Sequence, residues 1–424
     1  KRQRSSSSWK QPESIDVSRP FDIVIVGGGM VGASLAAALA PLPISIAVIE
    51  AWPPSGETQP SYDDRSTAVA EGSRRIFEGI GCWPEIEVSA TPISRIHVSD
   101  RGRFGFARLD HRDYGVPALG YVVENRQLGR VLWQTLSERD NVVLMSPARV
   151  DAVQLEPGSV KLTIDADGKE ATSLEASLLV AADGARSTVR EMLRLGESTW
   201  EYGQAALIAN VSPSEPHRNE AYERFTQTGP LALLPMSRNR CSLVWTLPPD
   251  LAAELAQANQ ADFLDRLQDA FGFRIGRFTR VGDRASYPLK LIRAQRQSAP
   301  RVLLIGNAAH SIHPVAGQGF NLGLRDVAAL ADVVADAVAS GTDPGVVSVL
   351  ESYSDWRRDD QQRVARITDS LVRLFTNPLS PVKAIRGLGL MGLDIAPGPK
   401  SVLAHQAMGL RGRLPRLARG LPLS

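Results

Sequence analysis

The sequence is poor in cysteine, since its 424 residues include only Cys82 and Cys241, which lie far apart and form no CxxC pair. This scarcity argues against a disulfide scaffold, a zinc site and a thiol redox centre. It fits a reducing compartment, so we expect a cytoplasmic protein. The sequence also lacks a cluster of metal-ligating residues and a Ser/His/Asp order, and we therefore expect an activity that needs no metal.

Uninterrupted hydrophobic runs of membrane-spanning length are missing as well. The stretch from Ile23 to Ile49 has no charged residue and is long enough to imitate a membrane span, but glycines at 27–29 and prolines at 41 and 43 break it into shorter elements. Residues 1–20 have no apolar core, which argues against a secretory signal and predicts a disordered leader. The remaining composition, with 43% hydrophobic and 22% charged residues, is typical of a globular protein with room for two domains.

Positive charge is concentrated near the C-terminus. The formal net charge of the whole chain is +2, yet residues 361–424 carry ten Lys/Arg and only two Asp/Glu. Aromatic residues are not interleaved with these basic residues, so nucleic-acid binding is not expected. A basic terminus rich in Leu and Gly fits two alternatives, contact with an anionic membrane surface such as the inner membrane, or a solvated final helix.

The first motif is a βαβ unit with a dinucleotide fingerprint. It consists of an apolar run at 21–26, the sequence GGGMVG at 27–32, a helix-forming segment at 31–40 and a second apolar run at 44–49 that ends at Glu50. In such a GxGxxG pattern Gly27 allows the tight turn, Gly29 lets a pyrophosphate approach the backbone, and Gly32 lets helix and strand pack closely. Glu50 is placed to accept hydrogen bonds from a ribose, and its carboxylate would repel the 2′-phosphate of NADP, which leaves FAD or NAD.

Two further strand-to-helix loops follow. An apolar run at 178–182 ends in Asp183-Gly184, and a helix begins with Ser187 and Arg190 in its first turn, a pattern that on its own is also typical of a capped turn. The segment 306–326 reads GNAAHSIHPVAGQGFNLGLRD, whose glycines allow close approach of a ligand and whose free amides at the helix start suit an electron-rich group. Three such loops in one chain indicate one large cofactor.

The other segments predict a second, mainly antiparallel unit. Residues 93–120 read as a β-ribbon, and alternating strands are expected at 205–211, 222–226, 232–235, 241–246 and 284–289, with a helix at 261–271. Residues 142–155 and 160–164 are expected to form strands of a peripheral sheet. Core packing is the favoured interpretation of the aromatic residues Tyr222 and Trp245.

Together, the three loops resemble the class A flavoprotein monooxygenases, the aromatic hydroxylases related to para-hydroxybenzoate hydroxylase. The resemblance covers most of residues 21–360. Within that family the segments ERFTQ at 223–227, GPLALLPM at 229–236, CSLVW at 241–245 and GNAA at 306–309 are most similar to the ubiquinone-biosynthesis hydroxylases, in particular those of the 2-polyprenyl-6-methoxyphenol type.

The resemblance implies an α/β fold. We expect a Rossmann-like FAD-binding domain of the para-hydroxybenzoate hydroxylase type, with an inserted antiparallel β-sheet substrate domain and a helical C-terminal segment. The expected boundaries are 21–92, 121–192 and 300–360 for the FAD-binding domain, 93–120 and 193–299 for the substrate domain, and 361–424 for the basic C-terminal segment.

The resemblance also implies roles for individual residues. Gly27, Gly29, Gly32 and Glu50 would hold the ADP half of FAD, Arg126 and Arg65 would approach the pyrophosphate or flavin, Asp183 would serve both FAD and NAD(P)H, Asn307 would meet the ribityl chain, and Pro314, Gly317, Gln318, Gly319 and Asn321 would line the isoalloxazine. Arg65 is equally well explained as a surface residue at a helix start. The family's usual residue at 307 is Asp, but an amide keeps the acceptor oxygen that a ribityl hydroxyl needs.

The reaction implied by the family uses NAD(P)H and O2. The reduced FAD forms a C4a-hydroperoxide that hydroxylates an activated phenol, and the protein must position the ring and exclude water. No catalytic base is identified; His313 and Tyr287, which is expected near the ring, are the candidates. His310 lies in the same loop and is better explained as a capping or packing residue.

The implied substrate is a polyprenylated phenol of ubiquinone biosynthesis, with 2-polyprenyl-6-methoxyphenol converted to the 1,4-benzoquinol. A lipophilic substrate would make contact with an anionic membrane surface useful, and other ubiquinone-biosynthesis proteins are expected as partners. Three alternatives remain open: hydroxylation at another ring position or of a soluble phenol, a flavin reductase without oxygen insertion, and a scaffold without activity.

Overall fold

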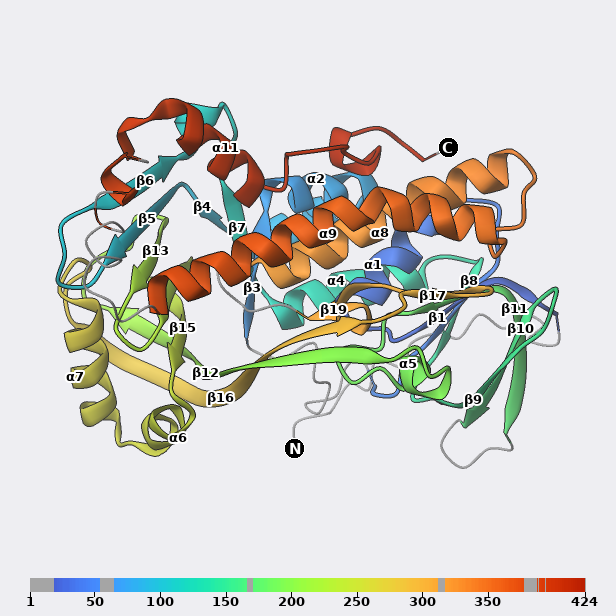
Figure 1. Ribbon diagram of the computed structural model, residues 1–424, viewed down its shortest axis with the longest axis horizontal. Coiled ribbons are helices and arrows are strands. Elements are labelled where there is room, and N and C mark those ends of the chain that lie inside the picture. The colour runs from blue at the N-terminus through green and yellow to red at the C-terminus, as the bar shows by residue number, and fades with distance from the viewer. Residues whose placement is uncertain are drawn as a thin grey trace, which may run out of the picture.

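The computed structural model describes residues 19–53, 65–165, 171–311, 317–376, 387, 389–392 and 394–423. Among these residues the strands form two eight-stranded sheets and one three-stranded sheet. The two large sheets lie at opposite ends of an elongated molecule, and two long helices, α8 (Gln318–Ala339) and α9 (Val347–Thr376), run along it (Figure 1).

The first sheet is mainly parallel, with the strand order β17-β18-β11-β1-β2-β8. Its strands are β1 (Phe21–Val26), β2 (Ile46–Ile49), β8 (Val142–Met145), β11 (Thr172–Ala181), β17 (Ser298–Ala299) and β18 (Val302–Leu304), and an antiparallel extension consists of β9 (Arg149–Leu155) and β10 (Val160–Asp165). β1 and β2 are apolar at nearly every position because both faces of the sheet are covered.

The two faces of this sheet pack against different partners. Ile23 and Ile25 face the helices α1 (Met30–Leu39), α4 (Asn125–Ser137) and α8 (Gln318–Ala339) in the largest hydrophobic cluster. Val24 and Val26 face a second cluster formed with β9, β10 and the short helix α5 (Thr188–Met192). The predicted βαβ unit is therefore confirmed, including the helix and both strands.

One prediction about this sheet was wrong. Residues 142–155 were expected to form only peripheral strands, but β8 pairs in parallel with β2, with Ile46 opposite Val142. The reason is that 142–145 is apolar and follows α4, so it completes a second crossover into the parallel sheet. Only β9, beyond the turn at 146–148, belongs to the extension.

The second large sheet has the strand order β19-β16-β12-β15-β14-β13-β5-β6. Its strands are β5 (Arg95–Asp100), β6 (Phe106–Asp110), β12 (Glu197–Pro213), β13 (Glu220–Phe225), β14 (Pro230–Met236), β15 (Arg240–Leu247), β16 (Phe278–Ala294) and β19 (His310–Ser311). The expected β-ribbon at 93–120 joins it because β5 pairs in parallel with β13. The helices α6 (Pro249–Gln257) and α7 (Gln260–Phe271) cover one face.

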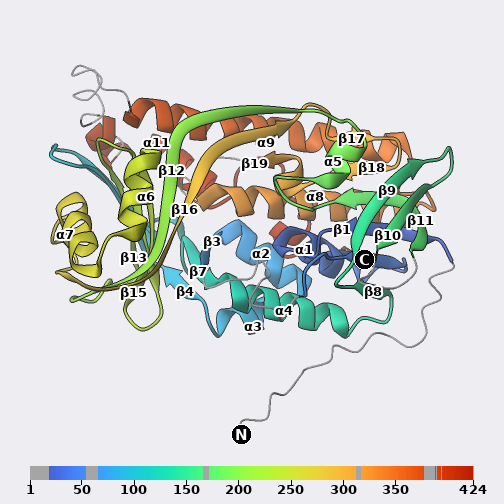
Figure 2. The same ribbon diagram turned by 90° about the horizontal axis from the view of Figure 1, so that it is seen from below.

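β12 and β16 are each 17 residues long and are the longest strands of the structure as described. They pair with each other and run side by side from the second sheet toward the first (Figure 2). Their pairing changes register between Glu201 and Ala205. The sequence predicted only their central parts, because the remaining residues are polar and largely exposed and do not form a clear hydrophobic alternation.

A small sheet and two helices connect the large sheets. The small sheet consists of β3 (Ser66–Ala70), β7 (Gly120–Glu124) and β4 (Thr91–Ile93). The helices α2 (Glu71–Ile80) and α3 (Trp83–Glu87) follow β3 in the chain, and the 3-10 turn η1 (His111–Tyr114) precedes β7. β3 contacts α8, and β4 and β7 contact β14. This sheet therefore places the start of α8 close to the second large sheet.

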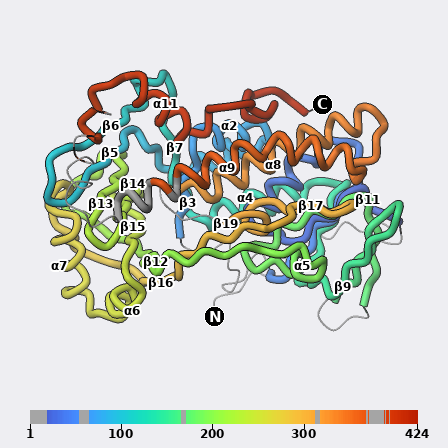
Figure 3. Tube along the Cα trace, viewed as in Figure 1, coloured from blue at the N-terminus to red at the C-terminus, as the bar shows by residue number. Residues whose placement is uncertain are grey.

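The C-terminal part packs on the rest of the molecule. α9 (Val347–Thr376) lies against α8, and α11 (Pro397–Ala407) lies over β5 and β6, after which the chain returns along α2 with the 3-10 turn η4 (Leu417–Arg419) (Figures 1 and 3). Leu417 and Leu423 are buried in the largest hydrophobic cluster. Within the described ranges no helix has both the length and the apolar character needed to cross a bilayer.

Candidate functional site

The loops that follow four parallel strands come together at one edge of the first sheet. The strands are in register, with Val26 opposite both Ile49 and Ala181, and Ala181 opposite Leu304. In open α/β sheets a ligand binds in the crevice outside the carboxyl ends of the strands. The glycine fingerprint, Glu50, the Asp-Gly motif and the start of the 306–326 segment therefore all lie at this edge.

The fingerprint glycines are required by the close approach of neighbouring backbone. Gly27 has a φ of 102°, and a Cβ there would lie 2.6 Å from the Ala182 carbonyl oxygen. A Cβ on Gly32 would lie 1.9 Å from the Gly27 carbonyl oxygen. Gly29 precedes α1, whose first turn has neither an acidic residue nor a side-chain cap. The amides at this helix start are therefore free for an anionic group such as a pyrophosphate.

Glu50 holds the glycine loop in place. Its side chain is only 6% exposed, and its two carboxylate oxygens accept the N–H groups of Gly28 (2.6 Å) and Trp52 (2.9 Å). Burial raises the pKa of Glu50, and these backbone hydrogen bonds oppose the rise. The Trp133 indole N–H donates to the Gly28 carbonyl at 3.1 Å from the opposite side. Trp133 was not predicted as a site residue, because it reads as an ordinary core residue of α4.

Asp183 is adjacent to the fingerprint. A Cβ on Gly27 would be only 2.8 Å from the Asp183 backbone nitrogen. Asp183 Oδ2 accepts hydrogen bonds from Thr188 Oγ1 and the Val189 N–H, both at 3.2 Å. Its other oxygen, Oδ1, is buried and has no hydrogen-bond partner among the described residues. A buried acceptor of this kind needs a donor, and a cofactor hydroxyl at this edge would supply one.

The Asp-Gly loop is tied to the third loop by Arg190. Its guanidinium donates to the carbonyl oxygens of Ala308 (2.7 Å) and Ala185 (2.8 Å) and is ion-paired with Glu197. The predicted capped turn is also present, because Ser187 Oγ accepts the Arg190 N–H at 3.1 Å. Arg190 therefore fixes the position of the two loops relative to each other.

The third loop packs on the first helix. Gly306 has a φ of 56°, and Cβ atoms built on Gly306 and Gly323 would lie 3.1 and 2.9 Å from the Val31 side chain. Asn307 is exposed in the 3-10 turn η2 (Gly306–Ala308). Gly317 has a left-handed φ of 61° at the start of α8. Since a helix rises about 1.5 Å per residue, Gly317 lies roughly 9 Å along the axis from Gly323, beside the same edge.

The first turn of α8 is held by side-chain contacts. Asn321 is 2% exposed, and its side-chain N–H donates to the oxygens of Gly317 (2.7 Å) and Ala68 (2.8 Å) while its oxygen accepts the Ala70 N–H (2.8 Å). Gln318 donates to the Ala407 carbonyl of α11 at 3.3 Å. Gly319 is half-buried in the same turn.

Three other predicted residues lie around the small sheet. The Arg65 guanidinium is 5.2 Å from the ring centroid of Tyr287 on β16, so it bridges the small sheet and the second large sheet. Tyr287 is 39% exposed. The Arg65 carbonyl accepts the Asn125 N–H at the start of α4, and the next residue, Arg126, is exposed in the first turn of that helix. His313 and Pro314 lie outside the described residues.

His310 is buried, as a packing residue would be. Its Nε2 is 2.6 Å from Asp326 Oδ2, and the same oxygen accepts the Gly306 N–H at 3.1 Å. Arg357 on α9 donates to Asp326 Oδ1 at 2.8 Å. Burial would raise the pKa of Asp326, but the charges of His310 and Arg357 outweigh burial and lower the pKa. This ion-pair network holds the start of the third loop in place through the Gly306 N–H.

The second large sheet contributes one acid that was not predicted. Glu223 on β13 is half-buried, and burial raises its pKa to about 7. It shares a strand face with Ala221 and Phe225, which pack toward the small sheet and toward the C-terminal segment at Leu390. Tyr222 points the other way, into the core with Trp245, so the core-packing interpretation of both aromatics is confirmed. No sequence signal distinguished Glu223, because the same strand also carries Glu220 and Arg224.

The crevice fits FAD. Three features lie along one edge of a Rossmann-like sheet: glycines that have no room for a Cβ, the start of α1 without a side-chain cap, and the buried Asp183 Oδ1 without a described partner. An antiparallel sheet adjoins that edge through the small sheet. Among the residues in view, no group of His, Cys, Asp and Glu side chains is arranged to hold a metal. The fold and site together define a flavoprotein built on a Rossmann-like sheet with an adjoining antiparallel sheet.

Comparisons with known proteins agree with this class. The family model described as "FAD binding domain" matches residues 20–368. The chain is 40% identical to the ubiquinone hydroxylase UbiL of Rhodospirillum rubrum over 97% of this chain and 96% of the relative. It is 33% identical to the 3-demethoxyubiquinol 3-hydroxylase of Escherichia coli over 93% of this chain and 100% of the relative. A solved structure, p-nitrophenol 4-monooxygenase PnpA of Pseudomonas putida, has a TM-score of 0.78 at 20% identity and covers 93% and 99% of the two chains.

The chain therefore belongs to the class A FAD-dependent monooxygenases, in the ubiquinone-biosynthesis hydroxylase family. Its cofactor is FAD, and NAD(P)H is the electron donor typical of the family. The predicted fold of the para-hydroxybenzoate hydroxylase type is confirmed. These findings argue against the alternatives of a scaffold without activity and a reductase without oxygen insertion.

Proposed function

We propose that this enzyme hydroxylates the ring of a polyprenylated phenol in ubiquinone biosynthesis, and that its substrate is 2-polyprenyl-6-methoxyphenol, which it converts to the 1,4-benzoquinol. The observation that carries the proposal is the similarity to a ubiquinone hydroxylase along nearly the whole chain, substrate sheet included. The printed name of the second relative specifies position 3 of a demethoxyubiquinol, so the position hydroxylated here is the part of the proposal that most needs a direct test.

The three loops would hold the cofactor in the following way. The amides of Gly29 and the start of α1 would bind the pyrophosphate, and Glu50 would accept a ribose hydroxyl with the lone pairs not used by Gly28 and Trp52. Asp183 Oδ1 would accept a hydrogen bond from the cofactor, and the exposed amide of Asn307 would meet the ribityl chain. When bound, FAD supplies the activation of O2 that no side chain of this protein can supply.

The flavin ring would lie between the start of α8 and the second large sheet. Gly317, Gln318 and Gly319 would border the ring through their backbone, while Asn321 would act as a positioning residue because its side-chain amide is engaged by backbone groups. Arg65, stacked on Tyr287, would close one side of the chamber, and Arg126 would face the anionic part of the cofactor. Closure of this side by Arg65 and Tyr287 would exclude water from the reacting oxygen.

Glu223 is the residue of the second sheet best suited to accept the phenol proton. A base with a pKa of about 7 is half ionised near neutral pH, which is favourable for proton transfer. Its position on the face that packs toward the small sheet directs it to the side where the flavin ring would lie. The carboxylate is the active form, so the rate should rise with pH through about 7.

Replacing Glu223 with Gln should lower kcat by about 10²-fold, the lower end of the usual effect of a general base, and should remove the rise of kcat around neutral pH. The measurement is the pH profile of substrate-dependent NAD(P)H oxidation. Glu220→Gln is the matched control, because Glu220 lies on the other face of the same strand and is ion-paired with Arg95. An unchanged pH profile in Glu223→Gln would remove this residue from the mechanism.

The substrate assignment is tested by product analysis. Incubation of the holoenzyme with NAD(P)H, ¹⁸O2 and a short-chain 2-prenyl-6-methoxyphenol should give the 1,4-benzoquinol with one labelled oxygen, because a monooxygenase inserts one atom of O2. The same assay with a demethoxyubiquinol and with phenol lacking a prenyl chain gives the comparison. Labelled product only from the demethoxyubiquinol would move the proposal to another ring position, and preference for the soluble phenol would remove the polyprenyl substrate.

A polyprenyl substrate resides in a membrane, so we also propose that the enzyme works on the cytoplasmic face of the inner membrane in contact with other ubiquinone-biosynthesis proteins. Part of the described C-terminal segment cannot contact a membrane, because Leu417 and Leu423 are buried and Arg416 contacts Asp332 and Asp336. Deletion of the segment would expose the core, so charge substitutions at exposed Arg411 and Arg419 are the better test of membrane contact.

A further inference from the structure

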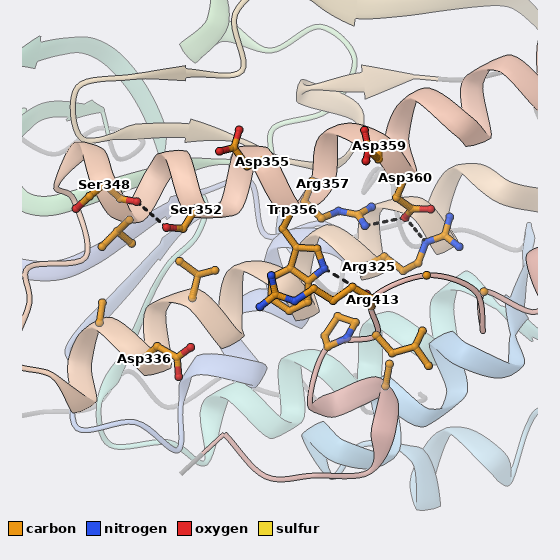
Figure 4. Close-up of a pocket in the computed structure, with 18 of the residues that line it drawn as sticks. Arg325, Asp336, Ser348, Ser352, Asp355, Trp356, Arg357, Asp359, Asp360 and Arg413 are labelled. Atoms are coloured by element: carbon orange, nitrogen blue, oxygen red, sulfur yellow. Dashed lines mark hydrogen bonds and ion pairs between the residues drawn. The ribbon is translucent and has the colours of Figure 1, made fainter.

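A cavity of about 870 Å³ lies between α8, α9 and the tail segment 409–418 (Figure 4). None of the predicted cofactor residues that the structure describes lines it. It is therefore separate from the crevice described above, although α8 borders both. Its walls are rich in charged side chains, and the balance of these charges indicates what it could bind.

Two buried arginines lie in its wall, Arg357 on α9 and Arg325 on α8, and Arg325 is the less completely paired of the two. Arg325 is 6% exposed, and its Nε lies 3.1 Å from Asp360 Oδ2. That oxygen is shared with Arg357, whose Nη1 is closer at 2.7 Å. Nη2 of Arg325 has no hydrogen-bond partner in the described part of the chain. Burial lowers the pKa of Arg325, as expected for a guanidinium whose charge is incompletely compensated.

The acidic residues of the wall do not neutralise the positive charge of Arg325. Asp336 and Asp355 are ion-paired with Arg416 and Arg358, two residues that do not line the cavity. Of the carboxylates that remain, Asp360 is shared between two arginines, and Asp359 is exposed on α9. The wall thus has fewer available negative charges than positive ones.

Three further arginines line the same cavity and form no ion pair with any described carboxylate: Arg363, Arg411 and Arg413. A Cβ on Gly409 would lie 3.3 Å from Arg325 Nη1, and one on Gly412 would lie 3.7 Å from Arg363 Nη1, so these two guanidinium groups face the tail. Arg413 stacks on Trp356 with its Cζ 3.9 Å from the ring centroid, which holds it at the rim (Figure 4).

We propose that this cavity is a binding site for a phosphate-bearing molecule, held by the buried guanidinium of Arg325 and by Arg363, Arg411 and Arg413. Guanidinium groups bind phosphate through paired, charge-assisted hydrogen bonds, and several arginines around one buried cation suit a group with more than one negative charge. Arg325 Nη1, which faces the tail, would contact the bound phosphate, because Nη2 is itself buried. The proposal does not depend on the identity of the phenol substrate.

The site can be tested with inorganic pyrophosphate and the FAD-loaded enzyme. Equilibrium dialysis with labelled pyrophosphate should show saturable binding of one molecule per chain, beyond the FAD already bound. Use of the holoenzyme keeps the fingerprint loop occupied, so binding there does not interfere. Absence of saturable binding would overturn the proposal.

Variants locate the binding. Arg325→Met should raise the Kd for pyrophosphate at least tenfold, since a hydrogen bond to a charged group is worth about 1.5–3 kcal/mol. Arg411→Gln, an exposed change that does not threaten folding, should raise it several-fold. Arg366→Met is the control, because Arg366 is exposed on α9, contacts Gln362 and does not line the cavity. Equal affinity in Arg325→Met, Arg411→Gln and the control would place the bound pyrophosphate elsewhere and overturn the assignment.

The phosphate could belong to a soluble molecule or to a lipid headgroup, and vesicles distinguish the two. Sedimentation with phosphatidylglycerol vesicles that is reduced by pyrophosphate and by Arg325→Met indicates a headgroup. Pyrophosphate binding that depends on Arg325, without such sedimentation, indicates a soluble phosphate. Vesicle binding that neither pyrophosphate nor Arg325→Met affects, together with no dialysis signal, contradicts the site altogether.

Discussion

The Gly32→Ala variant should lose bound FAD. The added Cβ would lie 1.9 Å from the Gly27 carbonyl oxygen and 3.3 Å from the Ala182 side chain, and a backbone atom cannot move aside as a flexible side chain can. Relief of such overlap usually costs about 1–3 kcal/mol. Because the strain falls on the loop that receives the pyrophosphate, we expect FAD affinity to fall about 10- to 100-fold. The measurement is flavin absorbance of the purified protein and titration of the apoprotein with FAD.

Gly158→Ala is the matched control for this experiment. Gly158 lies in the turn between β9 and β10, and nothing is within 4 Å of a Cβ built on it. This variant should retain FAD at the level of the unmodified protein. If Gly32→Ala also purified fully loaded with FAD and titrated with unchanged affinity, the close approach of helix and strand at Gly32 would not be needed for the cofactor.

The Asp326→Asn variant should be destabilised by about 3–5 kcal/mol, the usual effect of removing one partner of a buried ion pair. Asp326 is fully buried, and its carboxylate contacts Arg357, His310, Gln361 and the Gly306 N–H. Its lowered pKa means that it is ionised at neutral pH, so its full contribution is present there and is lost only as the pH falls through that lowered value. Urea unfolding of the holoenzyme at neutral pH measures the change.

Two further variants separate the loss of charge pairing from other causes. Adding Arg357→Met to Asp326→Asn removes a buried cation that has lost one of its two carboxylate partners, with Asp360 as the other, and should recover part of the lost stability. Asp355→Asn changes an ion pair whose carboxylate is 67% exposed and should alter stability by less than about 1 kcal/mol. Equal unfolding free energies for Asp326→Asn and Asp355→Asn would show that the network under the third loop is not a stabilising element.

The cofactor half of the fold could be predicted from sequence because its signals are local. The apolar runs of β1 and β2, the glycines between β1 and α1, and Glu50 lie within about thirty residues, and each has a direct physical reason. The exposed ends of β12 and β16 were missed because polar residues on both faces give no alternation. Helix α6 was missed because it has only nine residues and begins at consecutive prolines, which resemble a turn.

The contacts that support the site depend on residues distant in sequence, which a single sequence does not pair. Trp133 reaches Gly28 across 105 positions, and Arg190 reaches Ala308 across 118. His310 illustrates the same limit, since its place in the flavin-loop motif left a ligand contact open and only its bond to Asp326 assigns it to the interior. The ligand-facing roles of the predicted residues remain proposals, because they concern contacts with a cofactor.

The pairing of β12 with β16 has a consequence for how this family could acquire new substrates. The chain leaves the cofactor half at the start of β12, beside Glu197, and returns to it at the end of β16, beside Ala294. These two residues face each other in the pairing. The pairing therefore fixes the two points relative to each other, even when the residues between β12 and β16 change. Natural selection can therefore remodel the intervening strands and helices without displacing the FAD crevice, which agrees with the shared architecture of this chain and a p-nitrophenol 4-monooxygenase despite their low sequence identity.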